Sequence, residues 1–142
     1  MLVVDANIAV KWFSNEDDSV LALEITERKT LLYAPELIQW EVVAGICKNA
    51  KKSNANADLI KDSCQQWFDF LDNRDILIWE NKSLQSKAID LSVSLQHQFQ
   101  DCLYLALAME LDAELITADK TFAKRAISCF PRISFLHGND QL

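Results

Sequence analysis

The stretch LVVD at residues 2–5 is the strongest indication of the fold, because it is a short, β-branched apolar run that ends in a carboxylate. Such a run is typical of a strand buried in a parallel sheet. The stretch LITAD at residues 115–119 repeats the pattern far downstream. If the two strands are neighbours, Asp5 and Asp119 project into one crevice beyond the carboxyl edge of the sheet, where ligands bind. Two carboxylates there repel each other unless a cation lies between them.

The rest of the chain alternates strand-like runs with helical patterns, which predicts an α/β domain around a central parallel sheet flanked by helices. We expect strands over residues 2–5, 31–33, 75–79, 114–117 and 133–136. We expect helices over residues 6–13, 17–29, 36–50, 56–71, 81–97, 102–111 and 120–127, with a polar turn at 51–54. The helix over 102–111 is apolar almost all round, so it should be buried on most faces.

Length and composition predict a single domain over residues 1–142, long enough to bury a real core. The formal net charge is −7, so bulk charge does not attract nucleic acid, and any such binding needs metal ions or local Lys and Arg. The four cysteines form no CxxC pair, which argues against zinc. No signal peptide and no run of about 20 apolar residues is present, so we expect a cytoplasmic protein without membrane contact.

Four acids stand apart by position: Asp5, Glu41, Asp101 and Asp119. Taken singly, each aspartate stands where a helix N-cap is expected, and Glu41 could pair with a neighbouring Lys. Together, two of them end neighbouring strands and two belong to helices that pack against that edge of the sheet. Clustered carboxylate oxygens are hard ligands that suit Mg²⁺ or Mn²⁺.

The segments VVDANIAVKWF, PELIQWEVVAGI, DCLYLALAMEL and LITADKTFAKRA resemble the PIN-domain nucleases, most closely the VapC-type toxins of bacterial toxin–antitoxin pairs. The resemblance covers essentially the whole chain and implies a PIN-like three-layer fold. It implies that the four acids bind Mg²⁺ or Mn²⁺ and are the catalytic residues of a ribonuclease. Asn7 and Thr117 match polar positions that support the acids. The resemblance also implies a homodimer and a small antitoxin that occludes the site.

We therefore predict a metal-dependent endoribonuclease that acts as the toxin of a toxin–antitoxin pair. One alternative is a haloacid-dehalogenase-like phosphatase, which would need a second Asp where this chain has Asn7. The other is a non-catalytic binding module with an acidic, receiver-like pocket. Such a module would need a lone Asp at the end of a central strand, where this chain has Trp79 and Glu80.

The remaining polar and aromatic residues receive simpler interpretations. We expect His97 and His137 to be surface or structural residues isolated from the acids. The basic residues of 120–125 should contact RNA phosphates beside the acids, whereas those around the turn near 48–52 should form a solvated face. One small domain has limited room for four Trp and seven Phe, so some should lie in a dimer or antitoxin interface.

Overall fold

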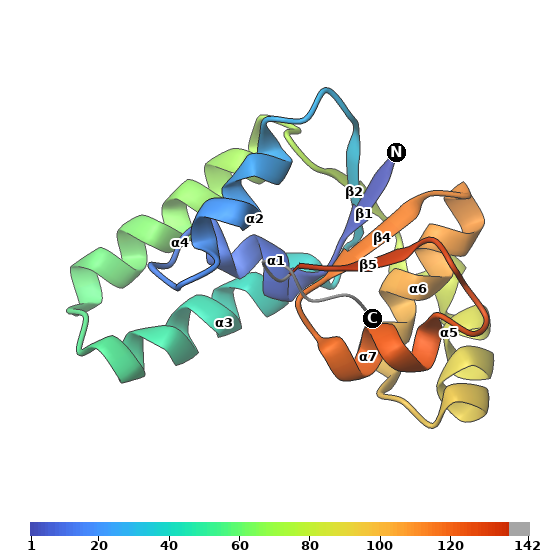
Figure 1. The fold of residues 1–142 in the computed structure, drawn as a ribbon. Coiled ribbons are helices and arrows are strands. Elements are labelled where there is room, and N and C mark those ends of the chain that lie inside the picture. The colour runs from blue at the N-terminus through green and yellow to red at the C-terminus, as the bar shows by residue number, and fades with distance from the viewer. Residues whose placement is uncertain (137–142) are drawn as a thin grey trace.

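A five-stranded parallel sheet forms the centre of the structure (Figure 1). The computed structural model describes residues 1–136 of the chain. Its strands are β1 (Leu2–Val4), β2 (Leu32–Pro35), β3 (Leu77–Trp79), β4 (Glu114–Thr117) and β5 (Ile133–Phe135). They follow the order β3-β2-β1-β4-β5, and every neighbouring pair is parallel. The predicted fold class is confirmed, and so is the expectation that β1 and β4 are neighbours.

Helices cover both faces of the sheet, as Figure 1 shows. The first group lies on one side and consists of α1 (Ala6–Lys11), α2 (Ser19–Thr26), α3 (Ile38–Ser53) and α4 (Ala57–Asp72). The second group lies on the other side and consists of α5 (Asn81–Leu95), α6 (Phe99–Leu111) and α7 (Lys120–Ala126). From β1 the chain first builds the sheet outward through β2 to β3, and then returns to the other side of β1 to add β4 and β5. Because crossovers between parallel strands are right-handed, the helices that connect these two halves of the sheet lie on opposite faces. None of these helices is long and apolar enough to cross a membrane.

The core lies where β1 and β4 meet α6. Val3, Val4 and Leu115 are fully buried, as a strand covered on both faces requires. The expectation for α6 is confirmed, because its residues from Cys102 to Ala108 are all buried. The carboxyl ends of β1 and β4 are therefore anchored in this buried core. The core in turn fixes the positions of the side chains that follow these two strands.

Several predicted helix boundaries are wrong. The second helix begins at Ser19 rather than at residue 17, and its N-cap residue Asp18 pairs with Lys11 at 3.0 Å instead of capping the helix with its side chain. The predicted turn at 51–54 is helical as far as Ser53. The helix ends at Asn54, whose φ of 52° lies in the left-handed region that Asn adopts readily. The sixth helix begins at Phe99, before the predicted start at 102.

Candidate active site at the carboxyl edge of the sheet

Asp5 directly follows β1 and is almost fully buried, with 3% of its surface exposed. Because Val4 pairs with Ile116, Asp5 and Thr117 lie at the same level of neighbouring strands. The Thr117 hydroxyl donates to Asp5 Oδ2 at 2.7 Å, and Asn7 Nδ2 donates to the same oxygen at 3.3 Å. Asp5 occupies the N-cap position of α1, but its side chain caps no backbone N–H there. The capping interpretation is therefore wrong for Asp5.

Thr117 joins three segments at this edge. Besides donating to Asp5, its hydroxyl accepts hydrogen bonds from the Asp119 backbone N–H at 3.0 Å and from Asn7 Nδ2 at 3.2 Å. Asn7 Oδ1 accepts from the Ala118 N–H at 2.9 Å. One donor and two acceptor positions are the full capacity of a hydroxyl, so this network holds the ends of β1 and β4 together.

Glu41 reaches the same edge from the first turn of α3. The Tyr104 hydroxyl donates to Glu41 Oε1 at 2.7 Å, and Tyr104 is fully buried. Tyr104 follows Asp101 by three residues in α6, a spacing that places both side chains on one face of the helix. The sequence analysis missed Tyr104, although this spacing was visible in the sequence.

Asp101 lies in the first turn of α6 and not at its N-cap, which is Gln98. The capping interpretation is therefore wrong for Asp101 as well. Its Oδ2 lies 2.6 Å from His97 Nε2, and the His97 side chain is only 7% exposed. The prediction that His97 is isolated from the acids is wrong. His97 lies in the turn before α6, just ahead of the N-cap Gln98, and this turn brings its ring onto Asp101 in the first turn of the helix. The two residues are only four positions apart, a closeness that was visible in the sequence. His137 lies outside the described residues.

Asp119 follows β4 and is a genuine N-cap. Its Oδ1 accepts from the Phe122 N–H at 3.0 Å and so begins α7. The capping interpretation is confirmed for this residue. The capping bond uses only Oδ1, so Oδ2 can still serve as a cation ligand. Asp119 can therefore cap α7 and also belong to the acid cluster.

The four acids interact through their charges. Burial raises the pKa of Asp5 to about 8, and the nearby charges of Asp101 and Glu41 add to the rise. Burial also raises the pKa of Glu41, against the lowering effect of the Tyr104 hydrogen bond. The pKa of Asp101 is raised by burial and by Asp119, and lowered in part by His97. Crowded carboxylates of this kind favour a cation or bound protons.

The donor set fits a hard divalent cation. Candidate ligand atoms of His97, Asp101 and Asp119 all lie within 4.8 Å of one another. Two oxygens on one Mg²⁺, each at about 2.1 Å from the ion, lie at most about 4.2 Å apart, so small side-chain movements are sufficient. Asp5 and Glu41 lie outside that group and are held by the Thr117 and Tyr104 hydroxyls.

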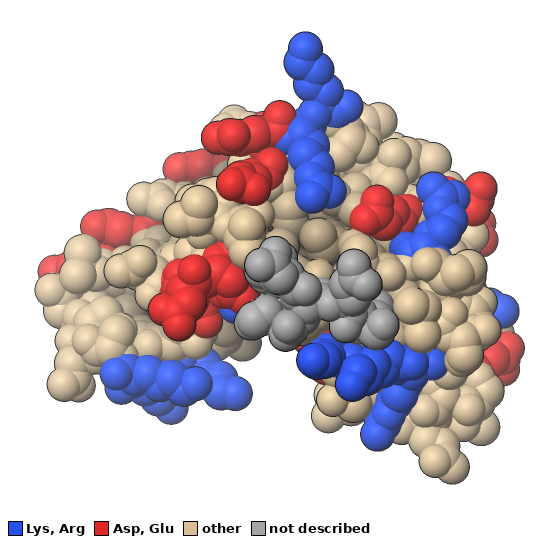
Figure 2. Space-filling model, viewed as in Figure 1, with Lys and Arg blue, Asp and Glu red and all other residues tan. Residues whose placement is uncertain are grey.

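Two groups of basic residues flank this part of the molecule. One belongs to the C-terminal half of α3, with Lys51 and Lys52 in its last turn. The other belongs to α7, with Lys124 and Arg125 in its last turn. Figure 2 shows Lys and Arg side chains gathered over these two helices, along the lower edge of the view. The acidic chain therefore carries local positive charge on both sides of the acids.

The aromatic residues divide between core and surface. Trp67 is fully buried and donates from Nε1 to the Gln39 carbonyl at 3.2 Å. Trp40, one residue before Glu41, is 69% exposed. Trp40 is thus an aromatic side chain available for contact with another molecule.

Together, the fold and this edge define a class of protein: a doubly wound α/β domain with a carboxylate cluster at its topological switch point. A family model described as PIN domain matches residues 2–127, and the chain belongs to that family. PIN domains are nucleases, so the match favours a hydrolase acting on nucleic acid over the phosphatase and the receiver-like module. No curated protein matches the chain.

Solved structures share the fold. A toxin–antitoxin complex from Klebsiella pneumoniae contains a chain with a TM-score of 0.69 and 22% identity, over 96% of this chain and 98% of that one. VapBC2 from Rickettsia felis, bound to a DNA fragment from their promoter, gives a TM-score of 0.60 and 17% identity, over 98% of both chains. At these identities the likeness shows the fold.

Proposed function

We propose that residues 1–142 form one PIN domain that cleaves RNA with Mg²⁺ or Mn²⁺ and acts as the toxin of a toxin–antitoxin pair. The observation that carries the proposal is the convergence of Asp5, Glu41, Asp101 and Asp119 at the β1–β4 edge of a PIN fold. These four are the proposed catalytic and metal-binding residues. Two structural neighbours, both toxin–antitoxin assemblies, support the toxin assignment.

A divalent cation, when bound, supplies positive charge for the scissile phosphate and acidifies water for attack. The protein's part is to hold the acids. Thr117 and Asn7 orient Asp5, and Tyr104 orients Glu41. We propose that the Lys and Arg side chains of α7 neutralise the phosphates of a nucleic acid lying across the acids, whereas the lysines of α3 keep their interpretation as a solvated face.

Expression of the chain in bacteria tests the toxin and its site together. We expect the wild type to arrest growth and Asp5→Asn to abolish the arrest, because the substitution removes a ligand charge while keeping the shape of the side chain. Asp90→Asn is the matched control, since Asp90 is an exposed acid of α5. Equal arrest by the wild type and Asp5→Asn would show that Asp5 is not catalytic.

Purified protein separates RNA from DNA as substrate. We expect Mn²⁺-dependent cleavage of single-stranded RNA, its loss in EDTA, and its loss in Asp5→Asn. Cleavage of a DNA strand of the same sequence at the same rate would contradict the ribonuclease assignment and leave the nuclease assignment in place.

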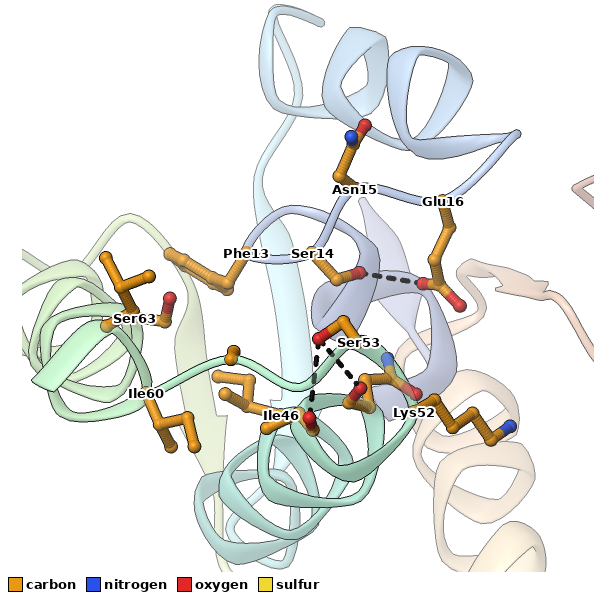
Figure 3. A pocket seen from close by; sticks show the side chains of 13 residues that line it. Phe13, Ser14, Asn15, Glu16, Ile46, Lys52, Ser53, Ile60 and Ser63 are labelled. Carbon is orange, nitrogen blue, oxygen red and sulfur yellow. Dashed lines mark hydrogen bonds between the residues drawn. The ribbon is translucent and has the colours of Figure 1, made fainter. Parts of the chain in front are cut away.

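A small antitoxin is the proposed partner, and the α3–α4 side of the molecule offers it a cavity. Figure 3 shows this cavity, of about 360 Å³, between the loop after α1 and the α3–α4 hairpin. Phe13, Ile46 and Ile60 give it apolar walls, and Lys52 lies at its edge. We propose that the antitoxin tail crosses this region near residues 48–52 and Glu41, and that a basic side chain of the tail enters the acid cluster. Charge reversal of the tail's basic residues should weaken the complex in a pull-down.

We also propose a homodimer. Exposed apolar side chains such as Trp40 (69%) and Val93 (74%) support a further protein contact. Light scattering of the purified chain tests this, and a monomer at all concentrations would contradict it.

A further inference from the structure

We propose that His97 and Arg125 form a relay that holds Asp101 in the orientation needed to bind a divalent cation. His97 is then a positioning residue, acting on the cation through Asp101. The inference rests on the proposed function, because it assumes that Asp101 is a ligand. It assigns a role to two residues that lie outside the set of four acids.

Both ring nitrogens of His97 have partners, and Arg125 decides which nitrogen carries the proton. Arg125 Nη1 lies 3.2 Å from Nδ1, and a guanidinium only donates hydrogen bonds, so Nδ1 is the acceptor. The ring proton therefore belongs on Nε2, which donates to Asp101 Oδ2 at 2.6 Å. A charged donor thus fixes the tautomer that delivers a hydrogen bond to the carboxylate.

Helix α7 also fixes the plane of the ring. Phe122 stacks on the imidazole with the ring centroids 4.7 Å apart and the planes 16° from parallel. Arg125 Nη1 donates to the Gln96 carbonyl at 2.9 Å, which fastens the turn between α5 and α6 to α7. The His97 side chain, 7% exposed, is therefore held by α7 on one side and by Asp101 on the other.

This arrangement leaves Asp101 one oxygen for the cation. Oδ2 is engaged by His97, and Oδ1 receives no hydrogen bond from any residue in 1–136. Candidate ligand atoms of Asp101 and Asp119 lie within 4.8 Å of each other, so the fixed carboxylate faces a second one. Partners that orient a metal ligand are typically worth about 10- to 100-fold in metal affinity.

Calorimetric titration of the full chain with Mn²⁺ tests the relay. His97→Phe retains a ring that stacks on Phe122 but has no N–H for Asp101, and we expect it to weaken Mn²⁺ binding about 10- to 100-fold. His97→Gln keeps an N–H donor on a side chain of similar reach and should recover most of the affinity. Melting curves in EDTA establish that each variant is folded.

Arg125→Gln and Lys124→Gln form a matched pair on α7, since each removes one positive charge. Loss of a positive charge near the acids by itself favours cation binding, and Lys124→Gln reports that general effect. We expect Arg125→Gln to bind Mn²⁺ more weakly than Lys124→Gln, because the Arg125 guanidinium lies 3.2 Å from His97 Nδ1 and so fixes the tautomer of the ring. Equal affinities for the pair would overturn the role of Arg125.

The other outcomes are equally distinct. If His97→Phe binds Mn²⁺ like the wild type while Asp119→Asn binds it weakly, the relay is wrong and the proposed metal site stands. If His97→Gln loses as much affinity as His97→Phe, His97 is itself a ligand and not a positioning residue. A wild type that binds no Mn²⁺ overturns the proposed metal chemistry and the relay with it.

A readout that needs no variant and no metal completes the test. Nitrogen-15 spectra of the imidazole in the metal-free wild type should show the proton on Nε2 of His97. A proton on Nδ1 would overturn the relay, because Arg125 would then face a second donor.

Discussion

The Asp5 carboxylate is almost fully buried. Its pKa therefore determines how the stability of the folded protein depends on pH. Burial raises that pKa to about 8, from an ordinary value of 3.8, with help from Asp101 and Glu41. Between about pH 4 and pH 8, Asp5 therefore keeps its proton in the folded chain and loses it in the unfolded chain. A group whose pKa is raised on folding contributes stability that is complete below the unfolded value and is lost as the pH rises through the folded value.

We predict that the metal-free protein loses stability between about pH 4 and pH 8, by at most about 1.4 kcal/mol per pH unit for this one proton. Urea unfolding in EDTA at pH 5 and pH 8 measures the loss. Asp5→Asn should flatten the dependence, whereas Asp90→Asn should leave it unchanged. Parallel pH dependences for the wild type and Asp5→Asn would mean that Asp5 is ionised in the folded chain.

Asp119 combines two roles at the residue scale, and Asp119→Asn separates them. Asn caps a helix as well as Asp, so the bond to the Phe122 N–H should persist. The substitution removes one ligand charge and the repulsion from Asp101. We predict a melting temperature in EDTA at or above that of the wild type, together with a smaller Mn²⁺ shift.

The size of the Mn²⁺ shift expected for the wild type follows from binding to the folded state alone. A ligand at a hundredfold excess over Kd stabilises the folded state by about 2.7 kcal/mol. Melting curves with EDTA and with millimolar Mn²⁺ give both quantities for each protein. An undiminished Mn²⁺ shift in Asp119→Asn would make Asp119 a cap only.

At the scale of elements, the approach of α1 to α3 sets the distance between Asp5 and Glu41. Gly45 makes this approach possible, because a Cβ at that position would lie 2.5 Å from Val10 Cγ2. We predict that Gly45→Ala destabilises the protein. Overpacking typically costs about 1–3 kcal/mol, which outweighs the gain of about 1 kcal/mol in helix propensity.

The double variant Val10→Ala/Gly45→Ala removes the clash and should be more stable than the sum of the two single variants predicts. Urea unfolding of the four proteins completes the cycle. Additive effects would show that Gly45 is not required for the contact between the two helices.

For the whole molecule, the proposed functions occupy two regions: the acids at the carboxyl edge of the sheet, and the cavity at the α3–α4 hairpin. Leu59 lines that cavity and is 57% exposed, so it belongs to neither the core nor the acid cluster. We predict that Leu59→Asp weakens antitoxin binding by at least tenfold, or about 1.4 kcal/mol, while the Mn²⁺ shift of the free chain stays unchanged. Binding assays on the purified pair measure the first effect and melting curves the second. Unaltered antitoxin affinity would place the tail elsewhere.

Strands β1 and β4, and the acids that follow them, could be predicted from the sequence alone. A buried parallel strand needs a short run of β-branched residues, and such runs at 2–4 and 114–117 are visible without any structure. The polar residues after these runs were visible for the same reason. That β1 and β4 are neighbours was a prediction from the sequence, and the parallel pairing of Val4 with Ile116 confirms it.

The side chains that hold the acids from other elements could not be predicted without the folded structure. Tyr104 meets Glu41 across 63 positions of sequence, and Arg125 meets His97 across 28, so folding alone makes these two contacts. The contact of His97 with Asp101, four residues apart, is local. The physical reason is the range of the interactions: strand and helix patterns are local, whereas hydrogen bonds and charges act between residues that only folding brings together.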